Sequence, residues 1–159
     1  MNRRQQAGTT AVEFAIIGTV AMVVILALIE FSRMVFVVNS LSEATRRGAR
    51  MAVVCPLNDP AIAQVTVFNA PGGGGNSPIV AGLSTANVAV EYLDQNGNVM
   101  GNPGGAFTQI RYARVRINNF QHSLFVPLAI STFTLPGYPS TLPRESLGIP
   151  RVGAGPLAC

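Results

Sequence analysis

The sequence contains little charge and no lysine. Charged residues make up 11% of its 159 residues, against roughly 25% in ordinary soluble domains. All of its basic residues are arginines, and the formal net charge is only +4. The low charge disfavours a conventional soluble enzyme. The mild and dispersed positive charge also argues against nucleic-acid binding, which depends on a concentrated basic surface.

Residues that carry metal or acid–base chemistry are also scarce. The single histidine, His122, and the two cysteines, Cys55 and Cys159, are far apart and show no CxxC spacing. A structural zinc site usually needs four protein ligands. No nucleophile–base arrangement surrounds His122, so we interpret it as a polar surface residue. We therefore expect no enzymatic activity, no cofactor and no metal site.

The two cysteines leave two interpretations open. If the region after the helix faces an oxidising compartment, Cys55 and Cys159 can form a disulfide. Such a bond would close a loop of about a hundred residues, which the chain-entropy treatment values at about 4–5 kcal/mol. The alternative is two free thiols, with Cys55 packed and Cys159 frayed at the end of the chain.

A long uncharged run follows a short basic start. The run covers residues 14–29, FAIIGTVAMVVILALI, and the start is MNRRQQAG, Met1–Gly8. At 1.5 Å per residue the run spans about 24 Å, and its neighbours extend it to a hydrocarbon core of about 30 Å. Arg3 and Arg4 predict that the N-terminus stays cytoplasmic.

A cleaved secretory signal peptide is the competing interpretation of this run. Such a peptide ends its apolar region in a small-residue site of the A-x-A kind, and none follows here. Instead, helical periodicity continues, with apolar residues at three- and four-residue spacings: Leu41, Ala44, Gly48, Ala49, Ala52 and Val53. We expect one retained helix from about Thr10 to Val54, stopped by Pro56.

The remaining residues predict a small α+β head. Asp59 and Pro60 suit the start of a short helix over Ala61–Phe68, although the β-branched residues there leave a strand open. Ala86–Leu93 and Arg111–Asn119 alternate as strands. The predicted fold class is therefore α+β, a long N-terminal helix packed on a small antiparallel sheet.

The connections in this head are rich in turn residues. Residues 71–78, PGGGGNSP, are expected to form a flexible loop, and Asn96-Gly97 predicts a hairpin turn. Residues 124–135 favour one or two further strands broken at Pro127. The proline-rich tail from Pro136 is expected to be mostly irregular.

Two groups of arginines are predicted to lie on the surface. Arg111, Arg114 and Arg116 alternate with apolar residues along the second strand, where they are expected to face solvent and discourage edge pairing. Arg46, Arg47 and Arg50 follow Glu43 on the helix. They suit either a solvated face with local ion pairs or contact with an anionic headgroup or a partner subunit.

The N-terminal junction carries a specific pattern. Gly8 is followed by Thr9-Thr10-Ala11-Val12-Glu13-Phe14. This resembles the prepilin-peptidase site of type IV pilin-like proteins, in which a basic leader ends in glycine and the fifth mature residue is glutamate. The segments AVEFAIIG, IEFSR and ATRRGAR resemble the TadE-like minor pilins, or pseudopilins, of the tight adherence (Tad) pilus, and TLPRES resembles the end of that family's domain. A proline common after the glutamate in that family is replaced here by Gly18-Thr19.

The resemblance implies a processing and assembly pathway. Prepilin peptidase would remove residues 1–8 by cutting between Gly8 and Thr9. Residues 9–54 would then be the helix, membrane-spanning in its first half, and 55–159 the exported head. The subunit would cross the inner membrane once, N-terminus cytoplasmic and head periplasmic. The pilus assembly platform would then move it, with other pilin subunits, into or beneath an extracellular adhesive filament.

Two other functions stay open beside this one. A pseudopilin of a type II secretion system is the nearer alternative, although the acidic calcium loops of some of those proteins are not evident here. A membrane-anchored binding domain that never polymerises is the other. In that case the leader would remain attached to the chain.

Gly8 and Glu13 each have a structural and a functional interpretation. Gly8 is either a flexible residue before a helix or the residue whose bare backbone the peptidase approaches closely. Glu13 can complete a capping box with Thr10. Alternatively Glu13, next to Phe14 at the start of the apolar run, pairs with the amino terminus created by cleavage, because a lone carboxylate in that environment is unfavourable.

Overall fold

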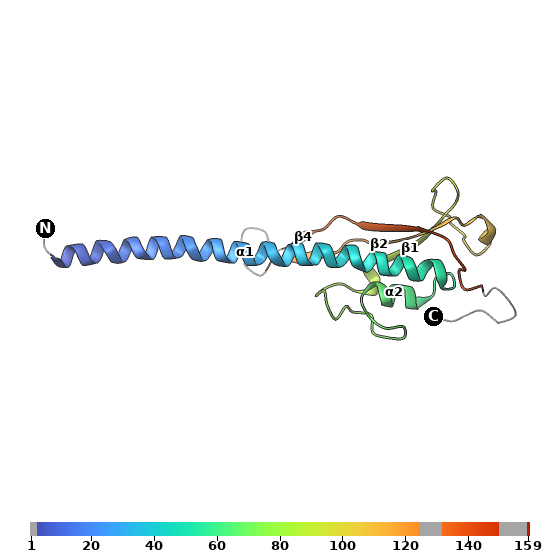
Figure 1. Cartoon of the computed structure of the whole chain (residues 1–159), viewed down its shortest axis with the longest axis horizontal. Coiled ribbons are helices and arrows are strands. Elements are labelled where there is room, and N and C mark those ends of the chain that lie inside the picture. Colours follow the sequence, from blue (N-terminus) through green and yellow to red (C-terminus); the bar gives the residue numbers. More distant parts are fainter. Residues whose placement is uncertain (1–2, 125–131, 150–158) are drawn as a thin grey trace.

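The computed structural model describes residues 3–124, 132–149 and 159, and one long helix leads into a small head (Figure 1). Helix α1 is Arg3–Val54 and α2 is Pro60–Thr66. Antiparallel strands form one sheet in the order β1-β2-β5 and a second that pairs β3 with β4. Their bounds are Val88–Leu93 (β1), Tyr112–Ile117 (β2), Gln121–Ser123 (β3), Thr132–Thr134 (β4) and Tyr138–Pro143 (β5). The predicted α+β class is confirmed.

Helix α1 starts earlier than expected and stops at the expected place. Its backbone is already helical at Arg3 rather than near Thr10, and it runs for 52 residues. At 1.5 Å per residue it is about 78 Å long. It ends at Val54, two residues before Pro56, because proline disfavours helical backbone in the residue that precedes it.

The C-terminal end of α1 is capped by a segment from late in the sequence. The backbone N–H groups of Glu145 and Leu147 donate to the carbonyl of Val53, and that of Gly148 donates to the carbonyl of Val54. The last carbonyls of a helix have no partner within the helix itself. Residues 145–148 therefore supply the hydrogen bonds that α1 cannot make.

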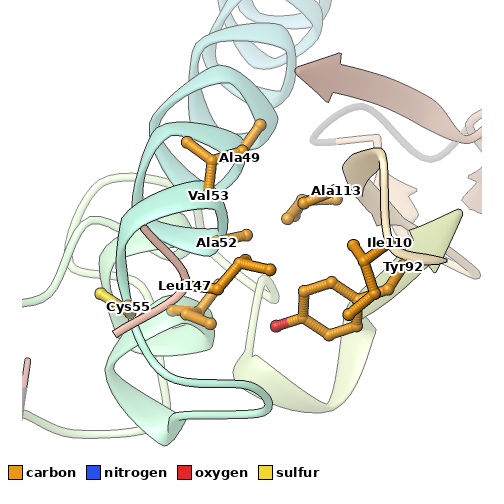
Figure 2. Packing of buried hydrophobic residues seen from close by; sticks show 10 residues of the cluster. Ala49, Ala52, Val53, Cys55, Tyr92, Ile110, Ala113 and Leu147 are labelled. Atoms are coloured by element: carbon orange, nitrogen blue, oxygen red, sulfur yellow. The ribbon is translucent and has the colours of Figure 1, made fainter. Parts of the chain in front are cut away.

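The head's core lies between the last turns of α1 and strand β2. All members of the predicted apolar stripe of the helix are buried: Leu41, Ala44, Gly48, Ala49, Ala52 and Val53. On β2, Ala113, Val115 and Ile117 are buried and alternate with more exposed residues. Figure 2 shows residues of the two elements facing each other across one cluster. The predicted apolar faces are therefore confirmed, and they pack against one another.

Tyr92 fills the end of this cluster. Its side chain is 2% exposed, and its hydroxyl oxygen accepts a hydrogen bond from the backbone N–H of Asn58 at 3.2 Å. Burial raises the pKa of the Tyr92 phenol above its ordinary value. The neutral ring can therefore remain in the core while its single polar atom stays hydrogen-bonded.

The arginines of β2 are paired rather than simply solvated. Glu91 of β1 lies directly across from Arg114, and the Arg114 Nη2 to Glu91 Oε2 distance is 2.6 Å. Arg116 also contacts the same carboxylate. Since β2 is the central strand of its sheet, the prediction that these side chains discourage edge pairing is wrong, while Arg111 before the strand is exposed as expected.

The tail expected to be mostly irregular also contains an edge strand, β5, which was not predicted. Pro139 and Pro143 lie opposite Arg116 and Tyr112 of β2. Arg111 and Arg144, the pair next to Tyr112 and Pro143, are hydrogen-bonded, because the N–H of Arg144 donates to the carbonyl of Arg111. Hydrogen-bonded and non-bonded pairs alternate in antiparallel sheets, so both prolines occupy positions whose N–H would point away from β2. The sheet therefore loses no hydrogen bond to proline there.

The short helix after α1 forms as predicted, and the strand alternative is wrong. Asp59 caps α2 by accepting a hydrogen bond from the N–H of Ala61 at 2.8 Å, with Pro60 in the first turn. The glycine-rich loop that follows is tied to α2, because Gln64 hydrogen-bonds both the N–H of Gly72 and the carbonyl of Gly73. This loop is therefore held by specific contacts.

The remaining connections agree in part with the sequence. Gly97 adopts a positive φ in the predicted hairpin turn, but the chain beyond it forms only an isolated bridge between Leu93 and Val99. Of the one or two strands predicted over residues 124–135, the structure shows Thr132–Thr134, and the break expected at Pro127 lies outside the described residues. The three-residue strand β3 was not predicted because it is too short for alternation to show.

Cys55 and Cys159 are joined by a disulfide, with their Cα atoms 5.8 Å apart. Cys55 directly follows α1 and is fully buried in the cluster shown in Figure 2. The bond joins residues 104 apart in sequence. It therefore holds the end of the chain beside the end of the long helix.

Replacing Gly48 by alanine should destabilise the head. A Cβ at this position would lie 2.1 Å from Thr66 Oγ1 and 3.0 Å from Val115 Cγ1. We expect a loss of roughly 1–3 kcal/mol from overpacking, although alanine is the better helix former. The measurement is the midpoint of chemical denaturation of the detergent-solubilised chain, monitored by near-ultraviolet circular dichroism.

Two variants control this experiment. Gly18→Ala should leave head stability unchanged, because nothing lies within 4 Å of a Cβ built there. Thr66→Ala in the Gly48→Ala background should recover part of the loss, since it removes the clashing hydroxyl. An unchanged midpoint for Gly48→Ala alone would contradict the proposed close packing.

Removing the disulfide should weaken the same unfolding transition. Cys159→Ser opens a loop of about a hundred residues, so we expect the free energy of unfolding to fall by about 4–5 kcal/mol. A reducing agent should destabilise the unmodified protein similarly and leave Cys159→Ser unaffected. Equal stability of the two proteins under oxidising conditions would show that the bond contributes nothing.

Candidate processing and assembly site

The residues expected to be processed lie in the first turns of α1, at the end remote from the head (Figure 1). The backbone is helical through both Gly8 and Thr9. Helix therefore continues across the expected cleavage point, and residues from Arg3 onward belong to it. A protease that binds extended backbone would have to unwind this part of the helix before cutting it.

The capping box is not formed in the uncut chain. Its first residue must be an N-cap with non-helical backbone, whereas Thr10 lies inside α1. Glu13 is exposed, and within the part of the chain that the structure describes it takes part in none of the ion pairs. Phe14, beside it, is 78% exposed. Helix capping therefore does not explain Glu13 before cleavage.

From Thr9 to Ile29 the helix surface is exposed and almost entirely apolar. Among the described residues, α1 is the one helix long and apolar enough to cross a membrane. Two of its hydroxyl groups bond within the helix: Thr19 Oγ1 donates to the carbonyl of Ala15 and Ser32 Oγ to that of Leu28, each at 2.8 Å. Internal satisfaction of polar groups is what a lipid environment requires.

A polar cluster marks the place where α1 meets the head. Arg33 Nη1 lies 3.0 Å from Glu30 Oε1 on the same helix, and Nε2 of His122 on β3 lies 3.6 Å from that oxygen. His122 is only 4% exposed, and its ring meets Phe133 edge-on with centroids 5.4 Å apart. The interpretation of His122 as a surface residue is therefore wrong. The contact was invisible in sequence because it joins residues 92 positions apart (122 minus 30).

The arginines farther along α1 are engaged locally. Glu43 Oε1 accepts from Arg47 Nε at 3.1 Å and Glu43 Oε2 from Arg46 Nε at 2.9 Å. The guanidinium of Arg47 also lies 5.1 Å from the centroid of the Phe68 ring. Arg50 is exposed. For two of these three side chains, the ion pairs with Glu43 support the solvated-face interpretation.

Comparison with known proteins gives one informative match. The family model of TadE-like proteins matches residues 8–50, which begins at the expected cleavage site and covers most of α1. No curated protein and no solved structure matches the chain significantly. Among the described residues, no group of three or more histidine, cysteine, aspartate or glutamate side chains could hold a metal ion. The resemblance to TadE-like proteins is thus confirmed, and the segment that carries it is the N-terminal helix.

Proposed function

We propose that this chain is a minor pilin or pseudopilin of the Tad pilus, processed after Gly8 and assembled through its N-terminal helix. One observation carries the proposal. The segment matched by the TadE-like family is the same segment that forms an exposed apolar helix of membrane-spanning length. Such a helix must be covered by lipid or by other subunits, and a pilin uses both in turn.

Processing at Gly8 is supported by the ease of unwinding there. Glycine in a helix interior is about 1 kcal/mol less favourable than alanine, and the first turn of a helix makes few of its own hydrogen bonds. Local opening near the end of α1 therefore requires little free energy. Prepilin peptidase would bind the opened chain at Gly8 and release Thr9 as the new amino terminus.

The proposed topology agrees with the charges and with the disulfide. Arg3 and Arg4 precede the apolar run, which favours a cytoplasmic N-terminus in the inner membrane. The head then lies in the periplasm, where a disulfide such as Cys55–Cys159 persists. The same bond would persist in an extracellular filament.

Glu13 is proposed to pair with the amino terminus that cleavage creates. Its carboxylate lies at the edge of the apolar run without an ion-pair partner among the described residues. Burial between packed helices would be unfavourable unless a positive group faced it. The Thr9 ammonium of the same or a neighbouring subunit provides that group, and Phe14 would lie in the same contact. The pairing would set the axial register during assembly on the platform.

Two alternative functions make different predictions. A pseudopilin of a type II secretion system would be processed in the same way but would act with secretion subunits. A membrane-anchored domain that never polymerises would keep its leader. The exposed apolar part of its helix α1 would then contact only lipid. Adhesion to a surface is proposed only for the pilus function.

Cleavage can be tested by the intact mass of the membrane-extracted chain. In cells with active prepilin peptidase, we expect the loss of Met1–Gly8, and full length without the enzyme. Gly8→Val should block cleavage because its Cβ prevents close approach to the backbone. Gly18→Ala, a glycine change in the same helix, should be cleaved normally. A chain that still begins at Met1 in peptidase-competent cells would refute the pilin proposal.

The role of Glu13 can be separated from cleavage. Glu13→Ala and Glu13→Gln should both be processed but should enter sheared filament fractions about tenfold less, which corresponds to the loss of about 1.4 kcal/mol per contact. Thr10→Ala is the matched control, because it removes only the capping-box partner. If Thr10→Ala impairs incorporation as much as Glu13→Ala does, capping rather than charge pairing is the function of Glu13.

A further inference from the structure

The base of the head reaches the part of α1 that the bilayer would surround. A hydrocarbon core of about 30 Å corresponds to about 20 helical residues. If it starts at Phe14, the first apolar residue after Glu13, the core ends close to Arg33. Leu124, directly after β3, nevertheless lines one groove together with helix residues from Val23 to Met34. The head therefore overlaps the outer part of the span.

At this level a groove lies between α1 and Leu124. Its volume is about 340 Å³, and apart from Glu30 its described lining is apolar: Val23, Leu26, Ala27, Phe31 and Met34 from α1, with Leu124 opposite. Leu26 is 38% exposed, whereas Val23 and Leu28 are 60% and 61% exposed. Leu26 is thus less exposed than its neighbours, and an apolar recess lies open beside Leu124.

We propose that this groove takes an acyl chain of an outer-leaflet phospholipid, so that the Leu124 end of the head is seated in the bilayer. The inference rests on the membrane insertion in the proposed function. Its occupant is lipid because the groove is continuous with the exposed apolar surface of α1. The groove also lies where that surface would be surrounded by hydrocarbon.

The charges around the groove suit this position. Glu30 would lie near the outer boundary of the hydrocarbon, where an unpaired carboxylate is unfavourable. Arg33 holds it at 3.0 Å, and the buried His122 faces it at 3.6 Å. On the neighbouring side, Arg33, His122 and Ser123 line a smaller cavity of about 160 Å³, together with five apolar residues: Phe36, Val37, Ile79, Val80 and Ala81. Glu30, Arg33 and His122 therefore gather beside the groove, near the level where the hydrocarbon would meet the lipid headgroups.

The absence of tryptophan from the chain permits a direct test. Leu124→Trp, made in the full-length chain, introduces a single indole whose depth can be measured. The protein is reconstituted into phosphatidylcholine and phosphatidylglycerol vesicles containing phospholipid brominated along its acyl chains, which quenches tryptophan on contact. Thr132→Trp reports the same end of the hairpin without removing Leu124, because Thr132 pairs with Ser123.

Two further tryptophans calibrate the experiment. Ile25→Trp lies on α1 at the same level but does not line the groove, and it should be strongly quenched. Val99→Trp, at the opposite end of the head beside Leu93, should not be quenched. We expect Leu124→Trp to lose at least half as much emission as Ile25→Trp, and Thr132→Trp to be quenched measurably.

The outcomes separate this inference from the proposed function. If Ile25→Trp is quenched but Leu124→Trp and Thr132→Trp are not, the proposal that the Leu124 end of the head lies in the bilayer is overturned. The proposed membrane span of α1 is then unaffected. Quenching of none of the variants would overturn both. If Leu124→Trp is shielded from bromolipid only at high protein-to-lipid ratio, lipid occupies the groove in the free subunit. Shielding of Leu124→Trp at every ratio, with Thr132→Trp still quenched, would overturn lipid as the occupant and indicate a second copy instead.

Discussion

The continuity of α1 is the constraint on which the rest of this molecule depends. Its first half exposes an apolar surface, while its last turns form one wall of the head's core. Because no break separates the two halves, any force on the membrane part of α1 acts directly on the head. A subunit that is extracted from a bilayer and packed into a filament would need its head and the membrane part of its helix to move together.

Several features keep the head attached to the end of that helix. Gly48 lets α1 approach α2 and β2 closely, and residues 145–148 complete the hydrogen bonds of its last carbonyls. The disulfide of Cys55 then joins the end of the chain to the same place. Covalent, polar and packing contacts thus converge within the last two turns of α1. The proposed processing site lies at the opposite end of the helix.

The base of the head addresses a different physical problem. Where α1 leaves the proposed bilayer, the chain must pass from an apolar to an aqueous environment. Glu30, Arg33 and His122 lie together near this boundary, and Glu30 also lines the apolar groove. The proposed lipid site therefore combines an apolar groove with a polar cluster beside it.

By itself the sequence determined the features that depend on near neighbours. Helical periodicity and capping are local, because they depend on residues a few positions apart. The sequence therefore determined the spacing from Gly8 to Glu13, the apolar run, the stripe from Leu41 to Val53 and the cap at Asp59. The tertiary structure alone decided which distant groups meet. Pro139 is accommodated because β5 lies at a sheet edge, and Arg114 is paired because Glu91 lies across from it. His122 is buried because β3 folds back onto Glu30. Such contacts depend on register and strand order, which no local pattern encodes.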